Sequence, residues 1–284
     1  MIVDSRQLFQ QLLRDFTTDD SRTEKEAILF WLLESKFALS RAEIIAGKKV
    51  RVDQSLLDQF MHRLNNHEPL QYILGEAEFY GRKFMVNPAV LIPRPETELL
   101  VKMVVDHFQG NKQEITLLDI GTGSGCIAIT LALELPFATV LATDISSDAL
   151  SIAKENAKRL MANVQFQIQD ILNDTLSMGQ LDAVVSNPPY ILENEKILLQ
   201  KKVVEYEPGQ ALFVPDPNPL LFHQAIAEKV RQSLKPGGLL LTEINERLSH
   251  ETAALFESFG YADVRIHKDL CGKNRLVSGM TNYE

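Results

Sequence analysis

The chain has 284 residues, of which 45% are hydrophobic, and it carries a formal net charge of −9 with a pI near 5.3. This length predicts one large domain or two unequal ones, with ample apolar residues for a core. The acidic balance argues against a protein whose affinity comes from neutralising nucleic-acid phosphates, because such surfaces are basic.

The cysteines and histidines do not suggest a metal or redox site. Cys126 and Cys271 lack metal-binding or redox spacing, and the six histidines form no ligand pattern, so we expect no metal and a reducing compartment. Residues 1–7 lack the basic patch and apolar core of a secretory signal, and no apolar run approaches the ~18 residues that span a bilayer. We therefore expect a cytoplasmic protein without a membrane partner.

Residues 1–75 are predicted to form a small, all-helical domain. Two of its helices are expected to begin at capping boxes, Thr23 with Glu26 and Ser40 with Glu43. A first helix is indicated by apolar residues at helical spacing, namely Leu8, Leu12, Leu13 and Phe16.

The core of this domain is predicted over 28–33, which contains the only tryptophan, Trp31. A fourth helix is expected over 53–64, ending at Asn65 and Asn66. None of these helices carries a recognisable chemical group arrangement. We therefore expect a domain that packs or docks and does not catalyse.

Residues 76–95 are predicted to form a β-hairpin linker between two domains. Aromatic and β-branched residues alternate over 79–86, and Asn87 with Pro88 is a turn signal. The prolines and acidic residues of 93–98 then open a helix that runs to about Phe108. This stiff loop is typical either of a helix start with dipole-matched carboxylates or of a pocket wall, and the residues leave both readings open.

Residues 96–284 are predicted to form an α/β domain, because strands and helices alternate from Ile115 onward. The segment 267–274 is too short for a crossover helix, so the last strand should be antiparallel in an otherwise parallel sheet. The expected strands are 115–120, 138–143, 163–168, 181–186, 238–243, 262–267 and 275–280, with helices near 124–134, 147–159, 219–234 and 249–258.

A glycine-rich turn follows the first of these strands and predicts a cofactor site, because glycines let the backbone approach a ligand. Asp119 stands two residues before the first glycine. The GxGxG spacing fits S-adenosylmethionine (SAM) better than a pyrophosphate, since SAM has no phosphate and its sulfonium is cationic. The turn comprises Gly121, Thr122, Gly123, Ser124 and Gly125.

Acidic residues follow the next two strands. Asp144 lies about twenty residues beyond the glycines, where it is placed to accept both hydroxyls of a ribose. After the third strand, Asp170 and Ile171 are suited to an adenine amino group and ring face. Each acid alone also fits a helix cap, as Asp144 does before Ser146. Ligands of such sheets bind at the carboxyl ends of the strands, which favours one shared cofactor site.

The fourth strand leads into Asn187, Pro188, Pro189 and Tyr190, which we predict to be catalytic. Prolines carry no N–H, so the Asn187 side-chain oxygen and the Pro188 carbonyl meet few competing donors and form a rigid pair of acceptors for an NH2 group. Tyr190 supplies a ring that would pack on the plane of that group. Pro-Pro can also simply end a strand. Its position at the edge that carries the glycines favours the site, with Asn187 also contacting the cofactor.

With these residues assembled, the chain resembles the HemK/PrmC family of glutamine methyltransferases that modify peptide-chain release factors. The resemblance covers nearly the whole length through 69–75, 91–98, the glycine turn and 185–190. Asn-Pro-Pro-Tyr alone also occurs in adenine-N6 methyltransferases, but its combination with 92–98 is highly specific. The proline-rich segment 214–219 and Asn245 depart from the family pattern, in loops outside the methyl-transfer centre.

This resemblance implies a Rossmann-like class I SAM-dependent methyltransferase domain and a helical N-terminal domain that helps to hold the release factor. The implied substrate is the glutamine of the factor's Gly-Gly-Gln tip. Rival functions are an adenine-N6 methyltransferase acting on a flipped base and a noncatalytic docking module for translation factors. The acidic charge disfavours direct nucleic-acid binding, and the intact glycine turn disfavours a noncatalytic role.

Overall fold

The structure is a computed structural model that describes residues 2–110, 113–176 and 178–282. The chain divides into two compact units. The first combines Met1–Glu76 with Gln200–Tyr206, and the second combines Ala77–Leu199 with Glu207–Glu284. No pattern in the sequence predicts that Gln200–Tyr206 belongs to the first unit.

The first unit is mainly helical. A short strand β1 (Ile2–Asp4) pairs antiparallel with β2 (Lys49–Arg51), and this pair adds to the helices that the sequence predicts. The helices are α1 (Ser5–Asp15), α2 (Arg22–Phe37), α3 (Arg41–Ala46), α4 (Gln54–Asn65), α5 (Leu70–Leu74) and α9 (Lys201–Tyr206).

The helix starts correct one prediction. The cap of α2 is Ser21 with Glu24, so the predicted box of Thr23 with Glu26 is wrong. The Glu24 carboxylate accepts the Ser21 N–H at 3.0 Å, and the Ser21 hydroxyl accepts the Glu24 N–H at 3.3 Å, so the box closes on the N–H groups at either side of residues 22 and 23. The predicted box of Ser40 with Glu43 is confirmed.

The core of the first unit is only partly the one predicted. Leu29, Leu32 and Leu33 are fully buried in it, whereas Trp31 is only partly buried and packs against its edge. An indole is large, and it often leaves its N–H edge near water. The buried leucines therefore carry most of the packing of α2.

The second unit contains a seven-stranded sheet with the order β12-β13-β11-β8-β5-β6-β7. Strand β13 runs antiparallel to both of its neighbours, and the remaining pairs are parallel, as predicted. The strands are β5 (Ile115–Ile120), β6 (Ala138–Asp144), β7 (Val164–Ile168), β8 (Leu181–Ser186), β11 (Leu234–Glu243), β12 (Ala262–Lys268) and β13 (Asn274–Met280).

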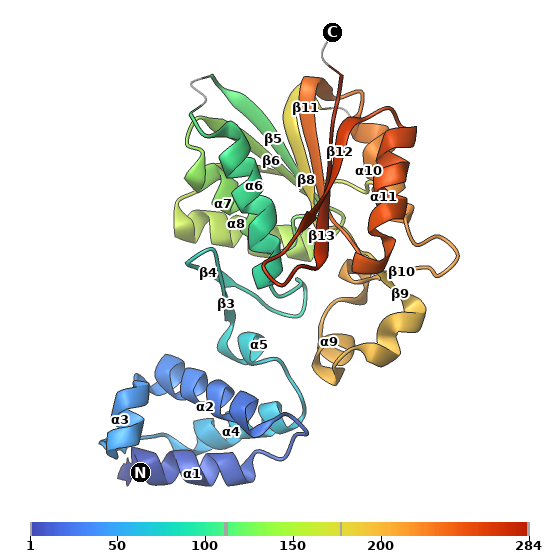
Figure 1. Ribbon diagram of the computed structural model, residues 1–284. Helices are drawn as coiled ribbons and strands as arrows, with labels where there is room; N and C mark the ends of the chain where they lie inside the picture. The colour runs from blue at the N-terminus through green and yellow to red at the C-terminus, as the bar shows by residue number, and fades with distance from the viewer. Residues whose placement is uncertain (1, 111–112, 177, 283–284) are drawn as a thin grey trace. The chain divides into compact units, whose positions relative to one another are not determined.

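Helices cover both faces of this sheet (Figure 1). Successive side chains of a strand point to opposite faces, so Leu117 joins the core beneath one set of helices and Leu118 joins the core beneath the other. One set is α6 (Glu98–Phe108), α7 (Cys126–Glu134) and α8 (Ser147–Leu160), and the other is α10 (Leu221–Val230) and α11 (Ser249–Ser258).

One helix is shorter than predicted. The helix expected over 219–234 ends at Val230, and Leu234 already belongs to β11, where it pairs with Leu181. Pro236 explains the difference because the residue before a proline favours extended backbone. The register of β11 against β8 then shifts between Leu234 and Leu239.

The predicted hairpin consists of β3 (Glu76–Phe79) and β4 (Arg82–Met85). Phe79 and Phe84 are fully buried in the core of the second unit, with ring centroids 6.1 Å apart. The smaller elements are η1 (Pro95–Thr97), β9 (Ile191–Leu192), η2 (Glu193–Leu198), η3 (Gly209–Ala211), β10 (Phe213–Val214), which pairs with β9, and η4 (Glu246–Leu248).

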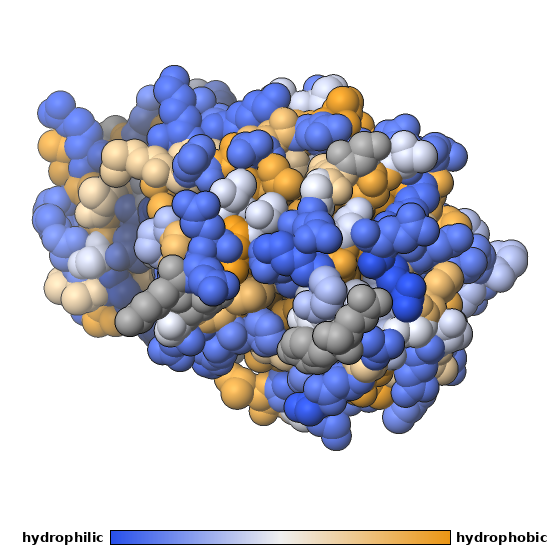
Figure 2. Space-filling model, turned by 90° about the horizontal axis from the view of Figure 1, so that it is seen from above, coloured by the Kyte–Doolittle hydropathy of each residue, from blue (hydrophilic) through white to orange (hydrophobic). Residues whose placement is uncertain are grey.

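Hydrophilic residues cover most of the face shown in Figure 2, with smaller hydrophobic areas between them. None of the described helices combines the length and the apolar composition that crossing a bilayer requires.

A buried amide ties the hairpin to the glycine-rich turn. Asn156 Oδ1 accepts the Met85 N–H at 2.7 Å, and Nδ2 donates to the carbonyls of Met85 and Ser124 at 3.0 and 2.9 Å. The Asn156 side chain therefore holds β4 against α8 and fixes the end of the turn.

Replacing Asn156 with leucine keeps the volume but leaves these main-chain groups without partners. We expect Asn156→Leu to lower the free energy of unfolding by roughly 2–4 kcal/mol, because each unmade buried bond costs about 1–3 kcal/mol. Urea denaturation measures the change. Asn163→Leu, at an exposed position, is the control and should change stability little. Equal stability of the two variants would contradict the role of Asn156.

Candidate active site

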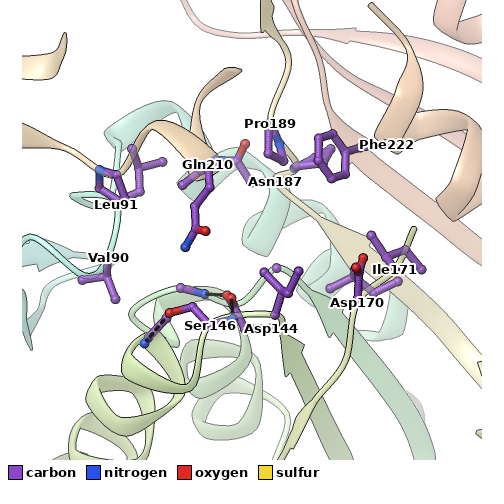
Figure 3. A pocket seen from close by; sticks show the side chains of 18 of the residues that line it. Val90, Leu91, Asp144, Ser146, Asp170, Ile171, Asn187, Pro189, Gln210 and Phe222 are labelled. Carbon is purple, nitrogen blue, oxygen red and sulfur yellow. Dashed lines mark hydrogen bonds between the residues drawn. The ribbon is translucent and has the colours of Figure 1, made fainter. Parts of the chain in front are cut away.

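One pocket of the second unit collects residues that follow four adjacent parallel strands (Figure 3). Because β5, β6, β7 and β8 are parallel, their carboxyl ends meet at one edge of the sheet. The predicted residues that line the pocket are Gly121, Gly123, Asp144, Asp170, Ile171, Asn187, Pro188 and Pro189.

The glycines of the turn divide into two kinds. Gly121 and Gly123 have φ of 74° and 54°, and a Cβ on either would meet no atom within 4 Å, so these two leave the backbone open to a ligand. A Cβ on Gly125 would lie 2.8 Å from Ile129 Cδ1 and 3.1 Å from Ala153 Cβ. Gly125 therefore allows close packing between α7 and α8 and does not line the pocket.

Thr122 and Ser124 are buried and also lie outside the pocket lining. The Thr122 hydroxyl donates to Asp119 Oδ2 at 2.7 Å, beneath the turn. Burial raises the pKa of Asp119 to about 7, and the negative charge of Asp144 acts in the same direction. A cation bound above this turn would favour the ionised form of Asp119.

Asp144 is not the cap of α8, because Ser146 holds that position and its hydroxyl accepts the Ala149 N–H. Asp144 Oδ2 instead accepts the Gly123 N–H at 2.8 Å and Oδ1 accepts the Ser146 N–H at 2.9 Å. Burial raises the pKa of Asp144. A carboxylate oxygen can accept more than one hydrogen bond, so each oxygen of Asp144 can accept a further bond from a ligand.

The wall opposite these acids comes from segments in which the sequence analysis identified no site residue. From the middle of η3, Gln210 points its side chain into the pocket, and its carboxamide makes no hydrogen bond to a described residue (Figure 3). Apart from Leu91, which begins the segment 91–98, the apolar part of this wall has no motif or periodicity that marks it in the sequence. It includes Val90, Leu91, Pro208, Ala211, Phe222 and Ile226.

The Asn187 carboxamide is hydrogen-bonded to the protein only through its nitrogen, among the described residues. Nδ2 donates to the Thr97 hydroxyl at 3.2 Å, and neither Asn187 Oδ1 nor the Pro188 carbonyl accepts a hydrogen bond from the described residues. Both residues line the pocket, with the Asn187 side chain beside Pro189 in Figure 3. Tyr190 lies outside the lining, because its hydroxyl donates to Glu243 Oε1 at 2.8 Å.

The proline-rich loop combines both of its predicted roles. It begins α6 through η1, while Leu91 lines the pocket and Thr97 contacts Asn187. Thr97 and Glu243 are buried and share a hydrogen bond of 2.7 Å. No motif marks either residue as functional in the sequence, although Thr97 lies within the segment 91–98 that carries the resemblance.

An ion pair fastens this loop to the segment before η3. The Arg94 guanidinium donates to Glu207 Oε1 at 2.6 Å, and the Ile92 N–H donates to Oε2 at 3.1 Å. The Glu207 side chain is 1% exposed, so water cannot solvate its charge, and the Arg94 guanidinium compensates that charge instead. The two bonds fix the walls that carry Leu91 and Gln210 relative to each other.

The pocket suits a nucleoside that carries a cation. Open glycines, acids at two strand ends and apolar walls fit a sulfonium-bearing nucleoside such as SAM. In the described part of the chain, no group of three or more His, Cys, Asp or Glu residues is arranged to bind a metal ion.

Comparison with known proteins agrees with this fit. A family model described as "Methyltransferase small domain" matches residues 95–206. Among solved structures, a methyltransferase from Pyrococcus furiosus has a TM-score of 0.53 at 17% identity, over 79% of this chain and 99% of its own. The Thermus thermophilus 16S rRNA N2 G1207 methyltransferase in complex with AdoMet and guanosine also has a TM-score of 0.53, at 16% identity over 73% of this chain and 50% of its own. These two likenesses show the fold.

Curated relatives identify the family. The "Release factor glutamine methyltransferase" of Bacteroides thetaiotaomicron is 44% identical over 90% of this chain and 92% of the relative. The protein of the same name from Flavobacterium psychrophilum is 39% identical over 89% of this chain and 91% of the relative. The chain therefore belongs to the release factor glutamine methyltransferase family, and it is a SAM-dependent methyltransferase.

Proposed function

We propose that this enzyme transfers a methyl group to the side-chain amide nitrogen of the glutamine in the Gly-Gly-Gln tip of peptide chain release factors. The names of the relatives support the substrate class. The observation that carries the proposal is the pair of unoccupied acceptors on the pocket wall, Asn187 Oδ1 and the Pro188 carbonyl.

These two acceptors match the two N–H bonds of a primary carboxamide. With one N–H directed to Asn187 Oδ1 and the other to the Pro188 carbonyl, the amide nitrogen keeps one face free. Pro188 and Pro189 hold the acceptors at fixed backbone angles, so little conformational entropy is lost when the amide binds. The chain thereby selects an NH2 group over a hydroxyl, which has only one hydrogen to donate.

The amide nitrogen is a weak nucleophile, because its lone pair is delocalised into the carbonyl. SAM, when bound, supplies a methyl group activated by a cationic sulfur. The contribution of Asn187 and Pro188 is to orient the nitrogen toward that methyl group, which is the kind of catalysis that positioning provides. The surplus proton leaves the nitrogen after transfer, so no tuned general base is required.

The remaining pocket residues would hold SAM. Gly121 and Gly123 would let the backbone approach its amino-acid part, and Asp144 would accept bonds from the ribose hydroxyls. Asp170 and Ile171 would contact the adenine amino group and ring face. The unit that contains 1–76 would help to hold the release factor, and no direct contact with nucleic acid is expected from a chain of net charge −9.

Removing the Asn187 acceptor should affect turnover more than cofactor binding. We expect Asn187→Ala to lower kcat by ~10²-fold or more, the scale of one lost transition-state contact, with the Kd for SAM nearly unchanged. Rates are measured with a purified release factor and SAM binding by calorimetry. Asn163→Ala, at an exposed position, should behave as wild type. Wild-type turnover of Asn187→Ala would refute the assignment.

The substrate residue is tested with radiolabelled SAM and two forms of a release factor, one intact and one with its tip glutamine replaced by alanine. We expect label on the intact factor and background label on the variant, because only the intact factor has the acceptor nitrogen. Equal label on both would show that the substrate residue is wrong. Label on an oligonucleotide but not on the factor would favour the adenine-N6 alternative.

Cofactor binding should depend on pH through Asp119. Because the pKa of Asp119 is about 7 without a cation, binding of SAM at lower pH must displace its proton. We expect SAM affinity to fall as pH drops from 8 to 6, by at most about tenfold per pH unit. Asp119→Asn should bind SAM more weakly at pH 8 and with a flatter profile.

Calorimetric titration of both proteins over this pH range makes the comparison, and it cancels the titration of the amino group of SAM itself. Parallel profiles for the wild type and Asp119→Asn would show that Asp119 does not respond to the cofactor.

A further inference from the structure

A chain of hydrogen bonds extends behind Asn187, on the side away from its free oxygen. Asn187 Nδ2 donates to the Thr97 hydroxyl at 3.2 Å, and that hydroxyl donates to Glu243 Oε2 at 2.7 Å. Tyr190 donates its own hydroxyl to Glu243 Oε1 at 2.8 Å. Thr97 is 2% exposed and Glu243 is 1% exposed, so water does not compete for these bonds.

The direction of each bond follows from the number of hydrogens available. A threonine hydroxyl has one hydrogen, and an ionised carboxylate only accepts. Thr97 therefore gives its hydrogen to Glu243, and its oxygen can only accept from Asn187. An asparagine amide has its donors on nitrogen alone, so nitrogen must face Thr97 and Oδ1 must face away from it.

The opposite orientation of the carboxamide is disfavoured for the same reason. A rotation of 180° about the last side-chain bond would place Asn187 Oδ1 against the Thr97 oxygen, with no hydrogen between them. It would also present an NH2 group to the incoming substrate amide, where donor would meet donor. Because a polar group without a hydrogen-bond partner keeps its full desolvation penalty, this orientation is disfavoured.

We propose that Thr97 and Glu243 are positioning residues that determine which end of the Asn187 carboxamide faces the substrate. The proposal rests on the proposed function, because it explains how the Asn187 oxygen is kept facing the substrate amide. Neither residue is placed to touch substrate or cofactor, since neither lines the pocket. Their effect on the reaction passes through Asn187.

The negative charge of Glu243 sets the direction of the hydrogen bonds from Asn187 to Thr97 and from Thr97 to Glu243. The groups that surround this carboxylate come from several elements. Burial raises the pKa of the Glu243 carboxyl, and the nearby Glu96 acts in the same direction. The hydrogen bonds from Thr97 and Tyr190 and the charge of Arg275 on β13 act against this shift and favour the ionised form. Tyr190 faces the carboxylate as a donor. His223 of α10 bonds to the main-chain oxygen of Glu243 at 2.9 Å, and burial lowers the pKa of this imidazole to about 4, so it stays neutral.

The pH dependence follows from these groups. When pH falls through the raised pKa of Glu243, the carboxyl gains a proton and becomes able to donate to Thr97. The Thr97 hydroxyl can then donate to Asn187 Oδ1, and the carboxamide is no longer held in one orientation. Turnover should therefore be complete above this pKa and should decline below it.

Two substitutions separate the hydroxyl of Thr97 from its shape. Thr97→Val removes the hydroxyl and keeps the volume, so both orientations of Asn187 become accessible. Thr97→Ser keeps the hydroxyl. Thr252→Val is the matched control, because Thr252 is also fully buried and donates to a main-chain carbonyl, that of Leu248, at 2.8 Å. Glu243→Gln introduces an NH2 group that can donate to Thr97.

The experiment measures kcat and the KM for SAM with an intact release factor. We expect Thr97→Val to lower kcat by ~10²-fold, the scale of a misplaced reacting group, with KM for SAM nearly unchanged. Thr97→Ser should restore most of the activity, and Thr252→Val should match the wild type. If Thr97 acts through Asn187, the double variant Thr97→Val with Asn187→Ala should be no slower than Asn187→Ala alone.

Opposite results overturn the proposal. Wild-type kcat in Thr97→Val, or fully additive losses in the double variant, would show that Thr97 does not act through Asn187. If Asn187→Ala is slow while Thr97→Val is not, only the positioning role fails. If Asn187→Ala also turns over at the wild-type rate, the proposed function itself fails.

A second variant keeps the test independent of folding. Circular dichroism and SAM binding show whether Thr97→Val is folded, and Glu243→Gln carries the test if it is not. Glu243→Gln should have a lower kcat and should lack the acidic decline of the wild-type pH profile. Retention of that decline would overturn the proposal.

Discussion

The site depends on one constraint, the parallel pairing of β5, β6, β7 and β8. Parallel strands end at the same edge of a sheet, so residues far apart in the sequence converge there without long-range contacts of their own. Gly123 follows β5 and Asp144 ends β6, and the two residues meet in a hydrogen bond of 2.8 Å. Asn187 reaches the same pocket because β8 pairs with β5 and places it beside the glycine turn. The sheet supplies the approximate positions, and side-chain bonds supply the orientations.

Because these polar groups are buried, each side chain is held in one orientation. Water would satisfy Thr97 and Glu243 in any arrangement, whereas in the dry interior each donor must meet an acceptor. The same reasoning applies to Asp119 beneath the glycine turn, where burial keeps the pKa near 7 and makes its charge responsive to a bound cation. Asp119 and Glu243 are therefore two buried carboxyl groups with different proposed tasks. Asp119 would favour the cofactor, and Glu243 would orient the acceptor for the substrate.

Local patterns predicted much of the fold. Hydrophobic runs predict the strands of the second unit, and the short segment before β13 predicts that this strand is antiparallel. A pattern four residues long predicts the Ser40 cap. Errors arose where two local signals compete. Both Ser21 with Glu24 and Thr23 with Glu26 fit a capping box, and only the first hydrogen-bonds as one. Helical periodicity predicts a helix over 219–234, whereas Leu234 already pairs in β11, where Pro236 disfavours helical backbone at the residue before it.

The sequence by itself determined the order of strands and helices, the glycine turn and the acceptor segment 187–190, because each depends on residues adjacent in the chain. It also determined the family, since the segments that carry the resemblance are contiguous. Only the tertiary structure decided that Thr97 contacts Asn187, that Glu243 joins Thr97 to Tyr190, and that Gln210 points into the pocket. Such contacts join residues separated by up to 146 positions, and no local pattern encodes a partner at that distance, because the partner is set by how the sheet and its loops pack.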